Sequence, residues 1–153
     1  MSVNVPSLTN QSNFVLTVEF SEEVNGFVLN DVVASGATLS ALQSLGGGRF
    51  TMNVTAAHGP VSFNLPAGIA SDLAGNASLA ATALAITVDL SSPLPSLTTA
   101  TPNLSNAASF TVAANFGERV LGFELSDLLL INGVASNLIE VNQAMGSYTF
   151  VVT

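Results

Sequence analysis

The chain has 153 residues, 48% of them hydrophobic, and can therefore bury the core of one ordinary domain or of two small ones. Its net charge is −8 although only 8% of its residues are charged, with ten acids, two arginines, one histidine and no lysine. Because clusters of Lys and Arg bind nucleic-acid phosphates and anionic membrane surfaces, both classes of partner are excluded, and the absence of cysteine excludes disulfides and thiolate metal sites.

The predicted elements are strands, and alternating hydrophobicity marks them in chain order. Residues 14–20 carry a large apolar side chain at every second position, and so do residues 49–55 and, after a Gly-Pro turn, residues 61–65. Residues 83–88 are predicted as a last strand, although their alanines would also suit a helix. Three consecutive glycines at 46–48 predict the hairpin loop that leads into the second of these strands.

Nothing in the sequence predicts insertion into a membrane. The longest apolar stretch, residues 79–88, is broken by two threonines and is too short to cross about 30 Å of hydrocarbon. Residues 1–6 lack a basic region followed by an apolar run, so they do not form a signal peptide.

The sequence repeats itself after 96 residues. Residues 6–31 and 102–127 are identical at 11 of 26 positions. Further along the offset becomes 98, since Thr51 and Val54 match Thr149 and Val152. A fixed period of this length indicates tandem repeats, and the drift of two residues indicates a loop insertion between strands.

The two repeats are unequal in length. We expect a first repeat at residues 1–91 that lacks its first strand, and a second at 92–153 that lacks its last strands because nothing in it matches residues 60–89. Both ends are therefore expected to be cuts within a longer protein. Short strands in a unit of about 95 residues predict an all-β, immunoglobulin-like Greek-key β-sandwich. Packing alone must hold it, since cysteine and tryptophan are absent.

The incomplete second repeat is expected to present an open apolar edge, because the strands that would cover it are missing. Such an edge is a template for another chain. We expect either a strand-swapped or edge-paired homodimer, or a second repeat that is loosely ordered beside a stable first one.

Several segments of the first repeat resemble motifs of bacterial Ig-like domains. The sequence FSEEVNGF at residues 20–27, followed by LND at 29–31, resembles the TFSEPVTGFTLDDL segment of those repeats. AGIASDLAGN at 67–76 is similar to their AGAATDAAGN loop. TVD at 87–89, with Pro93 after it, is similar to the VDTTAP linker that joins one repeat to the next.

The second repeat carries the first of these motifs again, as FGERVLGF at residues 116–123 with Asp127 after it. Gly117 and Arg119 depart from the usual Ser and Pro of the motif. Taken over the whole chain, the resemblance implies a stacked, non-catalytic spacer repeat of a large secreted bacterial surface protein, of the adhesin or biofilm-matrix kind. Its partners would be neighbouring repeats, its location would be extracellular, and no ligand is implied.

Two other functional classes compete with a spacer. A carbohydrate- or protein-binding Ig-like module is the first, but a sugar-binding platform usually needs exposed aromatic side chains. The chain has no tryptophan and one tyrosine, Tyr148, and its phenylalanines fall mostly in the core phase of the strands. An accessory domain of a secreted enzyme is the second, and only the parent sequence would show a catalytic neighbour.

No catalytic set is discernible in the sequence, and we expect no enzyme. His58 lies in a predicted turn with no acid at a useful spacing, so it is a poor candidate for a general base. Glu22 and Glu23 are adjacent, and on a strand they would point to opposite faces, so they do not form a hydrolase pair.

Oxygen-bearing side chains make Ca²⁺ the one cofactor to consider. In an Ig-like sandwich the loop that carries Glu22 and Glu23 and the loop that carries Asp72 and Asn76 share one pole. Ca²⁺ prefers six to eight such oxygens. The competing interpretation is that Asp72 and Asn76 only cap a turn through side-chain to backbone hydrogen bonds, and we favour it for this chain.

A junction site would combine residues of both repeats. Asp89 leaves the first repeat and is expected beside Glu118, the counterpart of Glu22 in the second. Asp31 and Asp127 occupy the same place in both repeats, and we interpret them as caps of the chain rather than as metal ligands.

Overall fold

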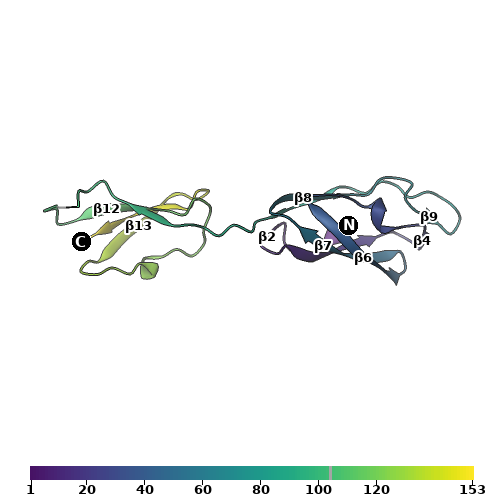
Figure 1. Ribbon diagram of the computed structural model, residues 1–153, viewed down its shortest axis with the longest axis horizontal. Coiled ribbons are helices and arrows are strands. Elements are labelled where there is room, and N and C mark those ends of the chain that lie inside the picture. The colour runs from purple at the N-terminus through teal and green to yellow at the C-terminus, as the bar shows by residue number, and fades with distance from the viewer. Residues whose placement is uncertain (104) are drawn as a thin grey trace. The chain divides into compact units, whose positions relative to one another are not determined.

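The computed structural model describes residues 1–103 and 105–153, and these form two compact units (Figure 1). Unit 1 comprises Met1–Ser91 and unit 2 comprises Ser92–Thr153. In the described part of the chain, no helix is both long and apolar enough to cross a membrane.

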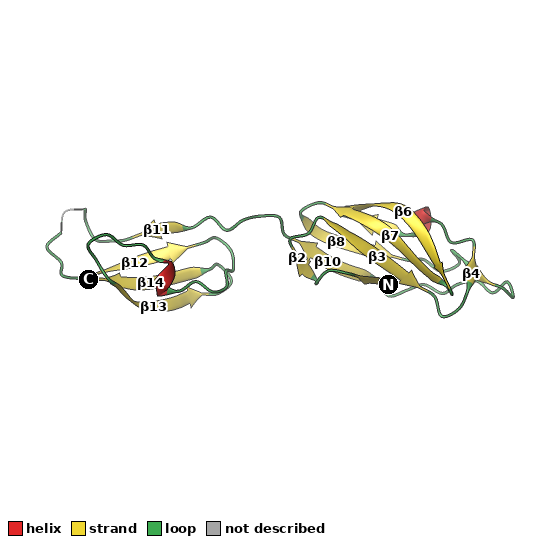
Figure 2. Cartoon of the chain, turned by 90° about the horizontal axis from the view of Figure 1, so that it is seen from below, coloured by secondary structure: helices red, strands yellow, loops and turns green. Residues whose placement is uncertain are grey.

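Unit 1 consists of two four-stranded sheets and one small strand pair (Figure 2). One sheet has the order β1-β3-β7-β6 and the other has the order β2-β10-β8-β5. The first sheet comprises β1 (Ser2–Val3), β3 (Asn13–Glu19), β7 (Arg49–Ala56) and β6 (Ala37–Gly46). The second comprises β2 (Leu8–Thr9), β10 (Leu84–Val88), β8 (Gly59–Asn64) and β5 (Val33–Ser35). The strand pair is β4 (Val24–Asn25) with β9 (Ser71–Asp72), and η1 (Leu29–Asp31) is a single 3₁₀ turn.

This arrangement is an immunoglobulin-like β-sandwich. We count β1 and β2 as one divided first strand and leave out the short pair of β4 and β9. The first sheet then holds the first, second, fifth and fourth strands of the unit. The second sheet holds the third, sixth and last strands, which is the division found in Ig constant-type domains. The predicted all-β sandwich is therefore confirmed.

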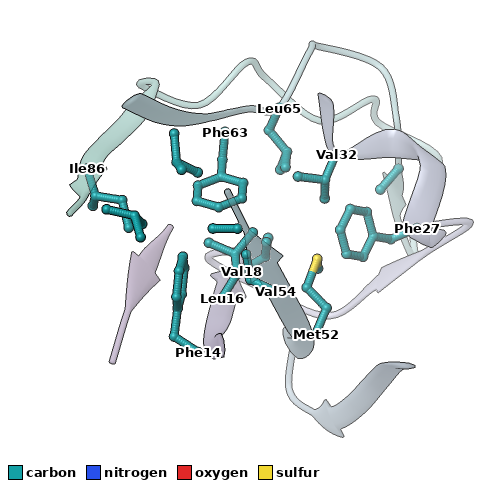
Figure 3. Close-up of a cluster of buried hydrophobic side chains, with 14 residues drawn as sticks. Phe14, Leu16, Val18, Phe27, Val32, Met52, Val54, Phe63, Leu65 and Ile86 are labelled. Carbon is teal, nitrogen blue, oxygen red and sulfur yellow. The ribbon is translucent and has the colours of Figure 1, made fainter. Parts of the chain in front are cut away.

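The core of unit 1 lies between the two sheets. Figure 3 shows Phe14, Leu16 and Val54 of one sheet pointing toward Phe63 of the other. The rings of Phe14 and Phe63 meet edge to face with centroids 6.5 Å apart. The alternation in β3 explains this packing, because Phe14, Leu16 and Val18 fall on the buried face of the strand while Val15 and Thr17 lie on the other face. The strands predicted at 14–20, 49–55, 61–65 and 83–88 correspond to β3, β7, β8 and β10.

The first strand of unit 1 is present, so the prediction that residues 1–91 lack it is wrong. β1 pairs antiparallel with β3, and β2 then crosses to the other sheet and pairs parallel with β10. Each piece has only two residues, which is too short for hydrophobic periodicity to reveal.

Unit 2 contains one four-stranded sheet with the order β11-β12-β14-β13, and its described residues form no second sheet. Its strands are β11 (Ser96–Thr98), β12 (Phe110–Asn115), β13 (Ala135–Asn142) and β14 (Ser147–Val152), and η2 (Leu125–Asp127) is its 3₁₀ turn. Phe110 pairs with Val152 in unit 2 as Phe14 pairs with Val54 in unit 1. The sheet of unit 2 is thus the counterpart of the first sheet of unit 1.

The change of offset from 96 to 98 lies in one hairpin. β6 and β7 are joined by residues 47–48, whereas β13 and β14 are joined by residues 143–146. Before this turn the offset is still 96. β6 and β13 each have a β-bulge next to a residue with positive φ, which is Ala41 in β6 and Asn137 in β13.

An aromatic trio closes the same end of each sheet. In unit 1 the rings of Phe20, Phe27 and Phe50 meet edge to face at centroid distances of 4.9–6.0 Å. The counterparts in unit 2 are Phe116, Phe123 and Tyr148, at 5.0–6.1 Å. The aromatic residues that match at offsets of 96 and 98 therefore pack alike in the two units.

Candidate functional site

The two loops that carry the predicted metal ligands of unit 1 lie side by side. β4 and β9 join them, with Val24 opposite Asp72. Glu22, Asp72 and Asn76 line a common hollow of about 290 Å³ at this end of the sandwich. Glu23 is exposed and is not part of the lining.

Asp72 and Asn76 are bonded to each other. The backbone N–H of Asn76 donates to Asp72 Oδ1 at 2.8 Å, and its side-chain amide donates to Asp72 Oδ2 at 2.6 Å. The N–H of Asp72 donates in turn to the carbonyl oxygen of Asn76 at 3.0 Å. The side-chain amide of Asn76, followed by its backbone N–H, lowers the pKa of Asp72 below its ordinary value of 3.8. The pair therefore closes a turn, as in the interpretation favoured from the sequence.

The hollow offers few ligands for Ca²⁺. Glu22, Asp72 and Asn76 supply at most five side-chain oxygens, fewer than the six to eight that Ca²⁺ takes, and both oxygens of Asp72 already accept hydrogen bonds. Across residues 1–103 and 105–153, no group of three or more His, Cys, Asp or Glu side chains is arranged to hold a metal ion.

Asp89 lies just after β10. Its N–H donates to the carbonyl oxygen of Thr9 at 2.8 Å, and its Oδ1 accepts from the N–H of Ser91 at 3.0 Å. Asp89 belongs to unit 1 and Glu118 belongs to unit 2, so their pairing in a junction site stays a prediction.

An acid that the sequence did not indicate lies close to His58. Asp89 Oδ1 lies 3.6 Å from His58 Nδ1, although the two residues are 31 positions apart. The same nitrogen of His58 accepts a hydrogen bond from the N–H of Leu90 at 3.0 Å. The imidazole therefore anchors the chain where it leaves β10.

Asp31 and Asp127 cap their 3₁₀ turns, as predicted. Asp31 Oδ2 accepts from the N–H of Val28 at 2.7 Å, and Asp127 Oδ2 accepts from the N–H of Glu124 at 2.9 Å. Each carboxylate thus satisfies a backbone donor at the start of its turn.

The family described as bacterial Ig-like domain matches residues 1–88, more than half of the chain and nearly all of unit 1. The chain belongs to the bacterial Ig-like domain family. No curated protein and no solved structure matches it. Membership accounts for the sandwich and for the motif at residues 20–31. This motif follows β3 and supplies Phe20 and Phe27 of the aromatic trio and the turn capped by Asp31.

One further feature of this Ig-like chain was overlooked in the sequence. Gly48 and Gly146 have φ of +77° and +56°, and a Cβ at either would overlap the carbonyl oxygen of Glu22 or Glu118, respectively. The N–H of Phe20 donates to the carbonyl oxygen of Gly48 at 2.9 Å, and Phe116 bonds Gly146 likewise at 3.2 Å. The internal repeat could have indicated this requirement for glycine, because Gly48 and Gly146 match at the offset of 98.

Proposed function

We propose that this chain is a non-catalytic structural repeat that serves as a spacer in a bacterial cell-surface adhesin or biofilm-matrix protein. The observation that carries the proposal is the pairing of the first and last strands of unit 1. β2 and β10 run parallel, with Leu8 opposite Thr87 and Thr9 opposite Val88. The N–H of Thr87 donates to the carbonyl oxygen of Ser7 at 2.7 Å, beside the bond from Asp89 to Thr9.

Parallel pairing of these two strands suits a load-bearing module. Tension enters unit 1 ahead of β2 and leaves it after β10, at opposite ends of the paired strands. It must therefore slide one strand along the other and load their hydrogen bonds together. Each such bond contributes only about 0.5–1.5 kcal/mol, so sharing the load is what makes a short strand pair resistant.

The surface chemistry supports the same role. The chain combines a net charge of −8 with no lysine, and its polar surface relies on Ser, Thr and Asn. Like-charged modules in an array repel each other and keep the array extended. A lysine-free surface also offers few cleavage sites to trypsin-like proteases outside the cell, because Arg49 and Arg119 are the only basic residues besides His58.

Stiffening by Ca²⁺ is part of the proposal. Its support in unit 1 is the hollow lined by Glu22, Asp72 and Asn76. Because these residues provide an incomplete ligand set, binding to unit 1 is expected to be weak and to need water or further protein oxygens.

Surface labelling of intact bacteria tests the proposed location. Antibodies raised against residues 1–91 should bind cells of the encoding bacterium without permeabilisation, while antibodies to a cytoplasmic protein should not. Labelling that appears only after permeabilisation would overturn the extracellular assignment. Specific, saturable binding of the chain on a glycan array would replace the spacer by a carbohydrate-binding module.

A further inference from the structure

The chain of unit 1 stays hydrogen-bonded for three residues after the last residue of β10. The N–H of Asp89 donates to the carbonyl oxygen of Thr9 at 2.8 Å. The N–H of Leu90 donates to Nδ1 of His58 at 3.0 Å. The N–H of Ser91 donates to Oδ1 of Asp89 at 3.0 Å. Residues 89–91 are therefore held by unit 1 through three successive backbone donors.

The direction of these donors explains why a side chain is needed at Leu90. Successive N–H groups of an extended strand point to opposite sides. That of Asp89 reaches β2, so that of Leu90 faces β8. The ladder between β8 and β10 ends where Val88 pairs with Gly59, because the residues before Gly59 form the turn that leads back to β7. His58 lies in this turn, and its imidazole supplies the acceptor that the backbone of β8 no longer provides.

The chemistry of the acceptor defines the state of the imidazole. Nδ1 accepts a hydrogen bond only when it carries no proton, so the ring is neutral and holds its hydrogen on Nε2. The side chain of His58 is 56% exposed, so core packing does not account for its position. The Asp89 carboxylate beside it accepts from Ser91, which leaves Leu90 as the donor to the ring.

We propose that His58 is an exit clamp, a positioning residue that holds Leu90 against the turn between β7 and β8 and passes tension from the departing chain into that turn. β7 belongs to one sheet of the sandwich and β8 to the other, so the turn joins both sheets. With the clamp, a pull on Ser91 is shared between the turn and the strands paired with β10. The clamp itself stands on the hydrogen bonds of unit 1, whereas its use under tension rests on the proposed spacer function.

NMR spectroscopy of the full chain in mildly alkaline buffer, where imidazole is neutral, tests the hydrogen bond. An N–H···N hydrogen bond transmits a scalar coupling between its two nitrogens. The chain has a single histidine, so the imidazole signals are unambiguous. We expect a coupling between the amide nitrogen of Leu90 and Nδ1 of His58. The absence of this coupling would overturn the clamp.

Two variants that differ in the acceptor atom test the role of the side chain. Asn places an oxygen as many bonds from Cβ as Nδ1 of histidine, whereas Phe keeps a ring with carbon at that position. His58→Phe should therefore speed amide exchange of Leu90 about twofold to tenfold, as expected for the loss of one hydrogen bond, and His58→Asn should leave it near the wild-type rate.

The amide of Thr87 is the internal control for these exchange rates. It donates to the carbonyl oxygen of Ser7 within the paired strands and should exchange at the wild-type rate in both variants. Equal acceleration of Thr87 and Leu90 in His58→Phe would indicate a general loss of stability and would overturn the proposal. An unchanged rate at Leu90 in His58→Phe would overturn it as well.

Single-molecule pulling between Asn4→Cys and Ser91→Cys tests the transfer of tension. The mean unfolding force should be lower with His58→Phe than with His58→Asn, and equal forces would show that the clamp bears no load. The clamp and the spacer role fail in different ways. A missing coupling between Leu90 and His58 overturns the clamp alone, whereas a wild-type chain whose unfolding force does not depend on the pulling direction contradicts the spacer role and leaves the coupling in place.

Discussion

Replacing Gly48 by alanine is expected to destabilise unit 1 by about 2–5 kcal/mol. Gly48 has φ of +77°, a conformation that costs an L-residue about 1–2 kcal/mol. The new methyl group would also overlap the carbonyl oxygen of Glu22 and lie 3.3 Å from Phe20 Cβ. Because backbone atoms must move to relieve the overlap, about 1–3 kcal/mol is added. The total does not exceed the usual stability of a domain, about 5–15 kcal/mol, so the variant should still fold.

Two further substitutions separate the overlap from the conformational cost. Gly47 has φ of +59°, and a methyl group there would meet nothing within 4 Å, so Gly47→Ala should cost about 1–2 kcal/mol. Gly146→Ala should repeat the larger effect in unit 2, where the methyl group would overlap the carbonyl oxygen of Glu118.

Urea unfolding of the full chain measures these effects unit by unit. Tyr148 is the single tyrosine and there is no tryptophan, so intrinsic fluorescence reports unit 2, while circular dichroism reports both units. Gly48→Ala should shift the dichroism transition and leave the tyrosine transition in place, and Gly146→Ala should shift the tyrosine transition. Equal destabilisation by Gly48→Ala and Gly47→Ala would refute the close-approach argument.

Three other predictions concern the core and the loop end of unit 1. Phe63→Ala should lower the unfolding free energy of unit 1 by about 3–5 kcal/mol in the same urea assay, because Phe63 is fully buried between the sheets. The turn closed by Asp72 and Asn76 should be intact at pH 5 and should loosen as the pH falls below 3.8 through the lowered pKa of Asp72, because protonation weakens the hydrogen bonds that the carboxylate accepts. The amide NMR signal of Asn76 should follow this titration in the wild type but not in Asp72→Asn. Saturating Ca²⁺ should raise the melting temperature only slightly, and Asp72→Ala should abolish that rise; a large rise that survives the substitution would place the bound ion elsewhere.

The elements that the sequence predicted are those whose side chains alternate between core and solvent. Phe14, Leu16 and Val18 mark β3 because one face of that strand is buried in the sandwich. β6 escaped prediction because it is an edge strand whose bulge at Ala41 interrupts the alternation. The internal repeat supplied part of the information that alternation did not, since the change of offset from 96 to 98 indicated the insertion that lies between β13 and β14.

The site residues show a sharper limit. Asp31 was predicted as a cap because its partner lies three residues away, and local hydrogen bonds follow from local sequence. The contact between His58 and Asp89 depends on how β7, β8 and β10 follow one another, and no spacing rule reveals it. Two apolar hollows of unit 2 likewise depend on loop packing, which periodicity does not describe.

Single-molecule pulling in two directions tests the load-bearing role most directly. The chain has no cysteine, so introduced thiols define the points of attachment. Force applied between Asn4→Cys and Ser91→Cys loads the parallel pair of β2 and β10 in shear. Force applied between Ala57→Cys and Ser91→Cys instead separates the antiparallel pair of β8 and β10 from one end, one hydrogen bond after another. We predict a clearly higher unfolding force in the first direction. Equal forces in the two directions, or a lower force between residues 4 and 91, would contradict the assignment of this Ig-like module as a load-bearing spacer.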